Sequence, residues 1–304
     1  MTTAIDLSQL PAPEVLEELD YEAILAERKA ALVALYSSDD QAAIERLLEI
    51  ESEPLTKLLE ENAYRELLLR QRINDAAQAV MLAHAKGSDL DQIGANYGVE
   101  RLMIDAGDSS AVPPVPPTYE NDSEFRRRIQ LSPEGYTTAG SEQSYIFHAL
   151  SADPDVLDAS AVTPTPGAVT VYVLSRTGDG TAPAATLSAV EGAVNDQSIR
   201  PMTDNVTVQS ASVVEYAITA ELTMFPGPDA AVVRDAAIAA AEAYAQRQHA
   251  MRRDITLSGV YAALHQSGVQ NVTLTSPVAD IVIGDGEASY CTGITVTTAE
   301  DTDV

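Results

Sequence analysis

One long helix constrains this chain more than any other feature. After Pro54 no proline or glycine occurs before Gly87, so a helix can begin near Pro54 and continue to about Lys86. At 1.5 Å per residue such a helix is on the order of 50 Å long, more than a compact small domain needs. Its apolar residues recur at spacings of four and three, the pattern of a coiled-coil seam: Leu69, Ile73, Ala76, Val80 and Ala83.

Two hypotheses explain what covers this seam. Two shorter helices precede it, one capped by Asp20 and running to about Tyr36 and one passing through Ile44 and Leu48, and they can pack on the seam within the chain. A long apolar seam can also join a bundle with another chain. The sequence leaves both hypotheses open.

Two arginines beside the seam fit either hypothesis. At an assembly interface an arginine can fork to a carboxylate of the partner, whereas within one chain the same arginines can pin two helices together. We take five residues as the candidate protein interface: Leu69, Arg70, Arg72, Ile73 and Val80.

Two glycines delimit a short helix that follows the long one. Gly87 suits a left-handed cap that ends the long helix, and Gly98 can end the short helix in the same way. An alternative is a helix-turn-helix DNA reader over residues 83–105. Such a reader needs positive charge on the next segment, but the stretch from Arg101 to Asp108 is neutral to acidic.

Paired prolines mark residues 106–118, and they predict an extended, semi-rigid linker. From about residue 154, strands alternate with helices. A strand at 167–174, a helix at 184–195 and a strand at 205–209 form a split βαβ pattern.

A second αβ unit begins with a strand of strict alternation at residues 213–224, whose apolar side chains fall on one face: Val214, Tyr216, Ile218, Ala220, Leu222 and Met224. A helix at 230–249, a strand at 269–275 and a hairpin-like return at 292–298 complete it.

The sequence therefore predicts an α+β fold, in which a helical N-terminal region is followed by two small αβ, split βαβ-like domains. We expect the helical region at residues 1–105, the Pro-rich linker at 106–118, a middle αβ domain at 119–211 and a C-terminal αβ domain at 212–304.

The charge of the chain limits its partners. The formal net charge is -28, which disfavours nucleic acid and anionic membranes and favours basic partners. The single cysteine, Cys291, allows no internal disulfide and no cysteine metal cluster. No apolar run is long enough to span a bilayer and no basic-then-apolar leader begins the chain, so we expect synthesis in the cytoplasm without a membrane span.

The sequence carries no motif of known enzyme chemistry. The four histidines are scattered, and no nucleophile elbow, phosphate-binding loop with lysine or dinucleotide fingerprint occurs. The Gly-Asp-Gly triplets at 178–180 and 284–286 are typical of tight turns. We expect no catalytic, cofactor-binding or metal-ligating residue and no enzyme, while an αβ enzyme with an unrecognised site stays an alternative.

Several spaced motifs carry a resemblance to a known family. They are Arg70-x-Arg72-x-Asn74, Ala76-Ala77, Gly87-x-Asp89-Leu-Asp91, Gly98-Val99 with Arg101, Phe125-Arg126 after an acidic helix start, and Arg200-Pro201-Met-Thr-Asp204 before a strand. With these motifs in this order, nearly the whole chain resembles the baseplate J family of contractile phage tails and tailocins.

The resemblance implies a structural baseplate wedge protein. It implies a helical part that bundles with a second, smaller wedge protein (tail protein I-like), and αβ domains that contact further copies of the chain. Sheath-initiating and hub proteins are further expected partners, and no nucleic acid is expected. The resulting ring would couple receptor contact to sheath contraction, with the 106–118 linker as a hypothetical hinge. The implied location is the baseplate of a virion or a tail-like particle made in a bacterial cytoplasm, and a phage and a bacteriocin-like particle fit equally.

Overall fold

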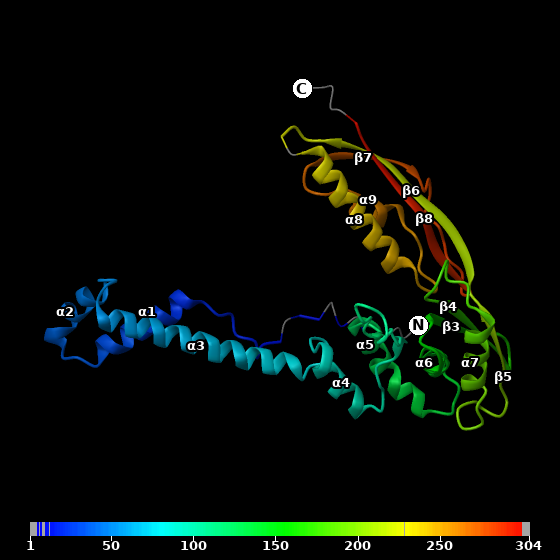
Figure 1. Cartoon of the computed structure of the whole chain (residues 1–304), viewed down its shortest axis with the longest axis horizontal. Coiled ribbons are helices and arrows are strands. Elements are labelled where there is room, and N and C mark those ends of the chain that lie inside the picture. Colours follow the sequence, from blue (N-terminus) through cyan, green and yellow to red (C-terminus); the bar gives the residue numbers. More distant parts are fainter. Residues whose placement is uncertain (1–4, 6, 8–9, 12, 228, 300–304) are drawn as a thin grey trace. The chain divides into compact units, whose positions relative to one another are not determined.

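The computed structural model describes residues 5, 7, 10–11, 13–227 and 229–299, and it divides into two compact units at residues 100 and 101 (Figure 1). The first unit, the helical unit, is built from helices. The second, the αβ unit, contains small sheets covered by helices. The predicted α+β class is confirmed. Within the described residues, no helix has both the length and the apolar character that a membrane span requires.

Three helices make the core of the helical unit. Helix α1 (Tyr21–Ala34) begins at Asp20, whose side chain accepts a hydrogen bond from the backbone N–H of Glu22. Helices α1 and α2 (Ser38–Leu48) fold back along the first half of α3 (Pro54–Ala79) (Figure 1). They enclose one apolar cluster: Ile24, Leu25, Val33, Leu48, Leu59 and Ala63.

Helix α3 ends at Ala79, so the predicted end near Lys86 is wrong. Its 26 residues span about 39 Å. The chain turns instead, because the backbone N–H groups of His84 and Ala85 both donate to the carbonyl of Met81, and this turn buries Ala85. Gly87 does have a positive φ of 50°, but it begins helix α4 (Gly87–Asn96) and does not end α3.

Gly98 ends α4 as predicted. It has a φ of 68°, and the N–H groups of Gly98 and Val99 donate to the carbonyls of Ala95 and Gly94. The chain then continues as strand β1 (Met103–Asp105). A helix-turn-helix over residues 83–105 therefore has no second helix after Gly98.

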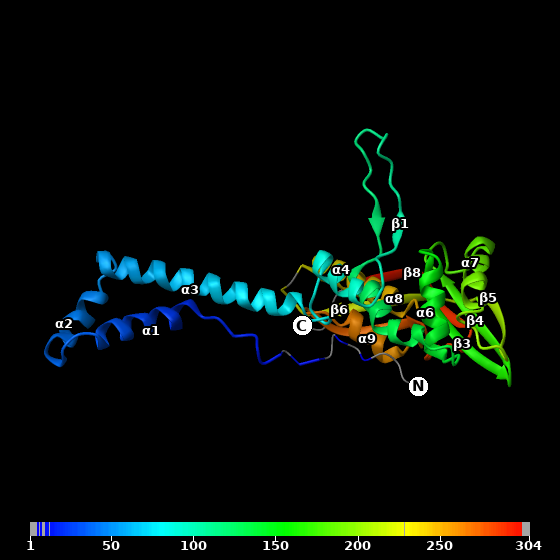
Figure 2. The same cartoon turned by 90° about the horizontal axis from the view of Figure 1, so that it is seen from below.

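The predicted linker at 106–118 is wrong, because this segment runs out and returns. Strand β1 pairs with β2 (Thr118–Tyr119) in antiparallel register, with Asp105 opposite Thr118. Further out, Asp108 and Val115 exchange two backbone hydrogen bonds of 2.9 Å. Figure 2 shows this arm (residues 103–119) standing out from the αβ unit. Prolines exclude a helix but allow extended hairpin strands, and the sequence does not reveal the pairing.

Gly107 is required where the arm begins. It has a φ of 67°, and a Cβ at this position would lie 2.3 Å from the carbonyl oxygen of Val115. The close approach of the two strands therefore excludes any larger residue.

The middle sheet has the order β3-β4-β5. Strand β3 (Val156–Thr165) is antiparallel to β4 (Ala168–Ser175), and helix α7 (Ala184–Val194) connects β4 to its parallel neighbour β5 (Asn205–Ser210). Since β4 and β5 are adjacent, no strand separates them as in a split unit, and the arrangement is a simple βαβ unit. Strand β3 was not expected from the sequence, in which the first predicted strand of this domain is at 167–174.

Two helices and a short turn of 3-10 helix precede this sheet. They are α5 (Asp122–Leu131), η2 (Ser132–Tyr136) and α6 (Glu142–Ala152). The core that α6 and α7 form with the sheet contains Tyr145, Ile146, Ala149, Leu150, Val171, Val173, Val190 and Val194.

The C-terminal sheet has the order β7-β6-β8. Central strand β6 (Ser212–Met224) is antiparallel to β7 (Val269–Ser276) and parallel to β8 (Glu287–Ala299). The predicted hairpin return is wrong, because β8 lies on the opposite side of β6 from β7. Helices α8 (Ala230–Gln248) and α9 (Leu257–Leu264) cover the face on which the alternation of β6 buries Tyr216, Ile218, Ala220, Leu222 and Met224.

The two sheets are tied together within the αβ unit. The carboxylate of Asp158, a buried residue of β3, accepts hydrogen bonds from the backbone N–H of Met251 at 2.9 Å and from the Arg127 guanidinium at 2.7 Å. The Ser160 hydroxyl donates to the carbonyl of Asp285 at 2.6 Å. The bonds from Met251 and from Ser160 connect residues 93 and 125 positions apart, so the αβ unit packs as one body.

The arm should be dispensable for folding. We expect replacement of residues 107–116 by Asn-Gly to change the melting temperature by less than about 3 °C, because Asp105 and Thr118 are already register partners. Thermal unfolding followed by circular dichroism measures this. A control with ten Gly/Ser residues keeps the length without the pairing, and a collapse of the melting temperature in the shortened chain alone would show that the segment is a spacer.

Candidate functional site

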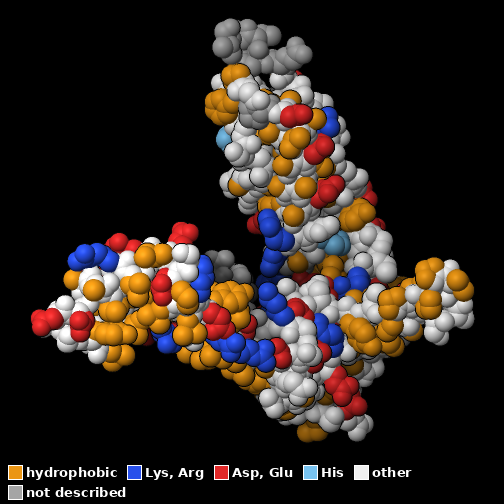
Figure 3. All heavy atoms as spheres, turned by 60° about the vertical axis from the view of Figure 1, so that its left-hand side comes forward, with side chains coloured by type: hydrophobic (Ala, Val, Ile, Leu, Met, Phe, Trp, Pro, Cys, Tyr) orange, Lys and Arg blue, Asp and Glu red, His pale blue; other side chains and the backbone are white. Residues whose placement is uncertain are grey.

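The predicted interface lies on a face of α3 that the chain leaves open. Leu69, Ile73 and Val80 are 66%, 63% and 76% exposed, and Leu58 lies on the same side. Leu58, Leu69 and Val80 are eleven residues apart, close to three helical turns, so these four residues form a stripe about 33 Å long. Figure 3 shows hydrophobic side chains gathered over the helical unit.

Helices α1 and α2 pack against a different side of α3, which buries Thr56, Leu59 and Ala63. The hypothesis that these helices cover the seam is therefore wrong. The sequence periodicity identified one apolar face of α3. It could not show that α3 has a second apolar face, which packs with α1 and α2 in the core of the helical unit.

The two arginines of the predicted interface have different surroundings. Arg70 forms ion pairs with Glu66 at 2.7 Å and with Glu17 at 3.3 Å. Hydrogen bonds from Arg28 and Arg70 lower the pKa of Glu66. Arg72 is exposed and forms no ion pair in the described part of the chain.

Buried Asn74 strengthens the intrachain contact of Arg70. Its amide oxygen accepts from the Glu17 backbone N–H at 3.1 Å, and its amide nitrogen donates to the Glu17 carbonyl at 2.8 Å. Arg70 and Asn74 thus hold the segment before α1 on α3. The hypothesis was that the arginines join two helices of one chain. Arg70 instead ties α3 to the segment before α1, and Arg72 forms no ion pair within the described residues.

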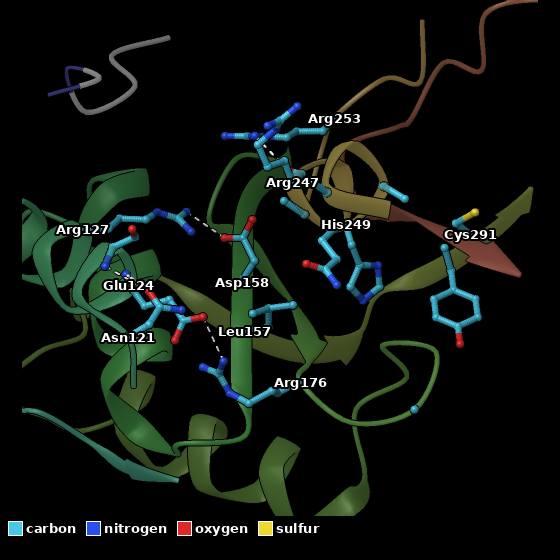
Figure 4. Close-up of a pocket in the computed structure, with 17 residues that line it drawn as sticks. Asn121, Glu124, Arg127, Leu157, Asp158, Arg176, Arg247, His249, Arg253 and Cys291 are labelled. Carbon is cyan, nitrogen blue, oxygen red and sulfur yellow. Dashed lines mark hydrogen bonds and ion pairs between the residues drawn. The ribbon is translucent and has the colours of Figure 1, made fainter. Parts of the chain in front are cut away.

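A second candidate surface is a cleft of about 780 Å³ in the αβ unit (Figure 4). Four arginines line it, from α5, the end of β4, and α8 with the turn that follows: Arg127, Arg176, Arg247 and Arg253. Two of them are neutralised, since Arg127 pairs with Asp158 at 2.7 Å and Arg176 with Glu124 at 2.9 Å.

The chemistry available in this cleft is limited. His249 donates a hydrogen bond from Nδ1 to the Ser289 carbonyl at 2.6 Å, and its ring meets the edge of Tyr290. The Cys291 thiol is aimed at a backbone carbonyl, that of Gly293. Among the residues that the structure describes, no group of three or more His, Cys, Asp or Glu is placed to hold a metal ion. The geometry suits the holding of an anion by guanidinium groups.

A buried ion pair joins the base of the arm to α5. Glu120 and Arg128 are paired with side chains only 3% and 7% exposed. The Leu102 backbone N–H also donates to this Glu120 carboxylate at 2.9 Å. Burial lowers the pKa of the Arg128 guanidinium, and the charge of Glu120 opposes that shift.

The family of the chain follows from comparison with known proteins. Family models of the baseplate J-like N-terminal, central and C-terminal domains match residues 51–108, 137–210 and 216–297, in that order. The chain belongs to the baseplate J-like family. It is also 54% identical over 294 residues to "Baseplate protein J" of Escherichia phage P2, with 97% of each chain covered.

Membership in this family makes the chain a structural component of a contractile-tail baseplate. All five predicted interface residues fall within the first matched domain. The predicted resemblance is confirmed over nearly the whole chain.

The sequence did not reveal that the four arginines of this baseplate protein share one cleft. Arg127 and Arg176 are 49 positions apart, and Arg247 and Arg253 follow Arg176 by 71 and 77 positions. No spacing rule connects them, since only the packing of the two sheets brings them together. Two signals were available: the run of three arginines at 126–128, and the absence of lysine and arginine after Arg253.

Removal of one partner of the buried pair at the base of the arm should strongly lower the stability of the αβ unit. We expect Glu120→Ala to destabilise the αβ unit by about 3–5 kcal/mol, because it leaves the Arg128 charge buried without its carboxylate. Urea denaturation measures this. We expect Glu120→Ala/Arg128→Met to recover much of the loss, and the exposed-pair control Arg234→Ala to cost at most about 1 kcal/mol. A loss no larger than that of the control would contradict this account.

Proposed function

We propose that this chain is a wedge subunit of the baseplate, and that the stripe on α3 binds a second, smaller wedge protein of the tail protein I-like kind. The single observation that carries the proposal is the exposure of four large apolar side chains along one side of α3. Scattered exposed apolar residues are ordinary, but large apolar side chains aligned along one side of a helix favour an interaction site.

The geometry of the stripe favours a helix as the partner. Its spacings of four, seven and eleven residues match the way one helix packs along another. Burial of each Leu, Ile or Val side chain contributes about 1.5–3 kcal/mol, from which the loss of freedom on association is subtracted. A helix with an apolar seam and an acidic residue beside it would cover the stripe and pair with Arg72.

The wider assembly belongs to the same proposal. Further copies of the chain, together with hub and sheath-initiating proteins, would complete a ring that couples receptor contact to sheath contraction. The αβ unit would move within it as one rigid body, because the bonds of Asp158 tie its two sheets together. The hinge proposed at 106–118 loses its basis, since that segment returns to its starting point.

Neither an enzyme nor a nucleic-acid-binding function is part of the proposal. The net charge of -28 opposes phosphate binding, and the family is one of structural proteins. No cofactor is proposed.

Charge placed on the stripe should abolish the hetero-complex. We expect Leu69→Asp/Ile73→Asp to weaken binding to the second wedge protein at least a hundredfold, and to leave the melting temperature unchanged because both side chains are exposed. Co-expression, followed by pull-down and light-scattering mass, measures this. The matched control is Leu68→Asp, an exposed leucine about 100° around the same helix. Equal loss in the control, or none in either, would refute the stripe as the interface.

Substitutions of Arg72 and Arg70 should have different effects in the same binding assay. We expect Arg72→Glu to weaken the hetero-complex about tenfold without loss of stability, because its charge has no partner within the described chain. Arg70→Gln should instead leave the complex intact and lower the stability by at most about 1 kcal/mol, since its exposed ion pairs lie within the chain. The reversed pattern would place Arg70 at the interface.

A further inference from the structure

The unpaired arginines of the αβ cleft carry an inference about self-association. We propose that this cleft binds an acidic peptide segment, and that its occupant is the segment 300–303 of a second copy of the chain. The inference deepens the proposed assembly with further copies of the chain, but it rests on a different surface from the α3 stripe.

Charge is the first argument. In a chain of net charge -28, the cleft is lined by four arginines and by only two carboxylates, Glu124 and Asp158. Those carboxylates are occupied by Arg176 and Arg127. Arg247 and Arg253 form no ion pair with a carboxylate of the described chain, so the cleft has an excess of positive charge.

Capping of helix α8 uses only some of the hydrogen-bond donors of these two arginines. Arg247 lies in the last turn of α8, and Arg253 donates from Nη1 to the Arg247 carbonyl at 3.0 Å. Positive charge suits a helix C-terminus. However, a guanidinium has five N–H donors in a planar fork, and the cap uses only one donor of the Arg253 guanidinium. The remaining donors fit carboxylates, which arginine binds in bidentate pairs.

The turn that carries Arg253 is held in place from several sides. Its preceding residue, Arg252, has a φ of 61° and forms ion pairs with Glu142 at 2.7 Å and Asp285 at 2.8 Å. The Asp254 carboxylate accepts from the Ile283 backbone N–H at 2.8 Å. Arg247 and Arg253 therefore lie on a rim of the cleft whose backbone is held in place (Figure 4). A ligand that binds there does not have to order this backbone, which lowers the entropic cost of binding.

The sequence supplies a complementary ligand. Residues Glu300, Asp301 and Asp303 place three carboxylates within four positions, directly after strand β8. They lie outside the described residues. Such a segment offers the carboxylates that two adjacent guanidinium groups can bind.

The reach of this segment makes the contact intermolecular. Cys291, which lines the cleft, pairs with Tyr216, and Ala299 pairs with Thr223 at the other end of β8. The eight residue steps from Cys291 to Ala299 span about 26 Å of strand. The four residues from Ala299 to Asp303 extend at most about 14 Å. The segment cannot reach the cleft of its own chain, so a second copy must supply it.

A peptide titration tests the inference. The receptor is the full chain with Glu300→Gln/Asp301→Asn/Asp303→Asn, so that no receptor molecule can fill the cleft of another. The probe is a fluorescein-labelled peptide of residues 297–304, Thr-Thr-Ala-Glu-Asp-Thr-Asp-Val. We expect saturable binding by fluorescence anisotropy that weakens as the salt concentration rises. Binding should fall at least tenfold for a peptide with the same three neutral substitutions.

Variants of the receptor locate the binding site. We expect Arg247→Gln/Arg253→Gln to weaken peptide binding at least tenfold, and the lysine pair Arg247→Lys/Arg253→Lys to recover part of it. The matched control Arg234→Gln, on the same helix but outside the cleft, should bind like the parent receptor. Both altered residues are exposed, so the circular dichroism and melting temperature should be unchanged. Absence of binding at low salt, or equal binding by the neutral peptide or by the Gln pair, would overturn the inference.

The experiments can distinguish a failure of peptide binding at the cleft from a failure of the proposed wedge function. Leu69→Asp/Ile73→Asp should leave peptide binding intact, because the α3 stripe lies in the other unit. A chain that forms the hetero-complex but does not bind the peptide would overturn the cleft inference alone.

Discussion

The buried carboxylate of Asp158 is the contact on which the arrangement of the αβ unit depends. It receives the Arg127 guanidinium, its neighbour's backbone N–H and the backbone N–H of Met251, which lies 93 positions further along the chain. A charge buried this deeply is tolerated only with full hydrogen bonding. Those bonds join the middle sheet to the turn after α8, and that turn carries Arg253 to the rim of the cleft. The joint between the sheets and the candidate anion site thus share one set of contacts.

Helix α3 shows how one element can serve a core and an interface. Its buried face holds α1 and α2, and polar Asn74 on that face is satisfied by both backbone groups of Glu17. The stripe on the other side leaves Leu69, Ile73 and Val80 largely in solvent. Because the core is complete without the stripe, the exposed apolar surface is a property of the folded helical unit, and it carries the proposed interface.

The arm illustrates a different use of exposed chain. A two-stranded hairpin is marginal by itself in water, yet this one is fixed at its base by the buried pair of Glu120 and Arg128. Arg101 adds to that base through Asp122 at 2.8 Å and through the face of the Phe125 ring at 4.7 Å. A stable base with an exposed tip, where Val112 is 97% exposed, suits a projecting contact better than a flexible joint.

Local pattern in the sequence determined many of the elements, although not strand β3 or the end of α3. The alternation at 213–224 marked the buried face of β6, Asp20 marked the start of α1, and Gly98 marked the end of α4, because each of these signals acts between near neighbours. Long-range pairing was decided only in the tertiary structure. The return of the arm, the place of β8 beside β6, the second face of α3 and the gathering of four arginines all depend on contacts between distant residues. No periodicity encodes such contacts, since their free energy exists only once the sheets and helices have packed.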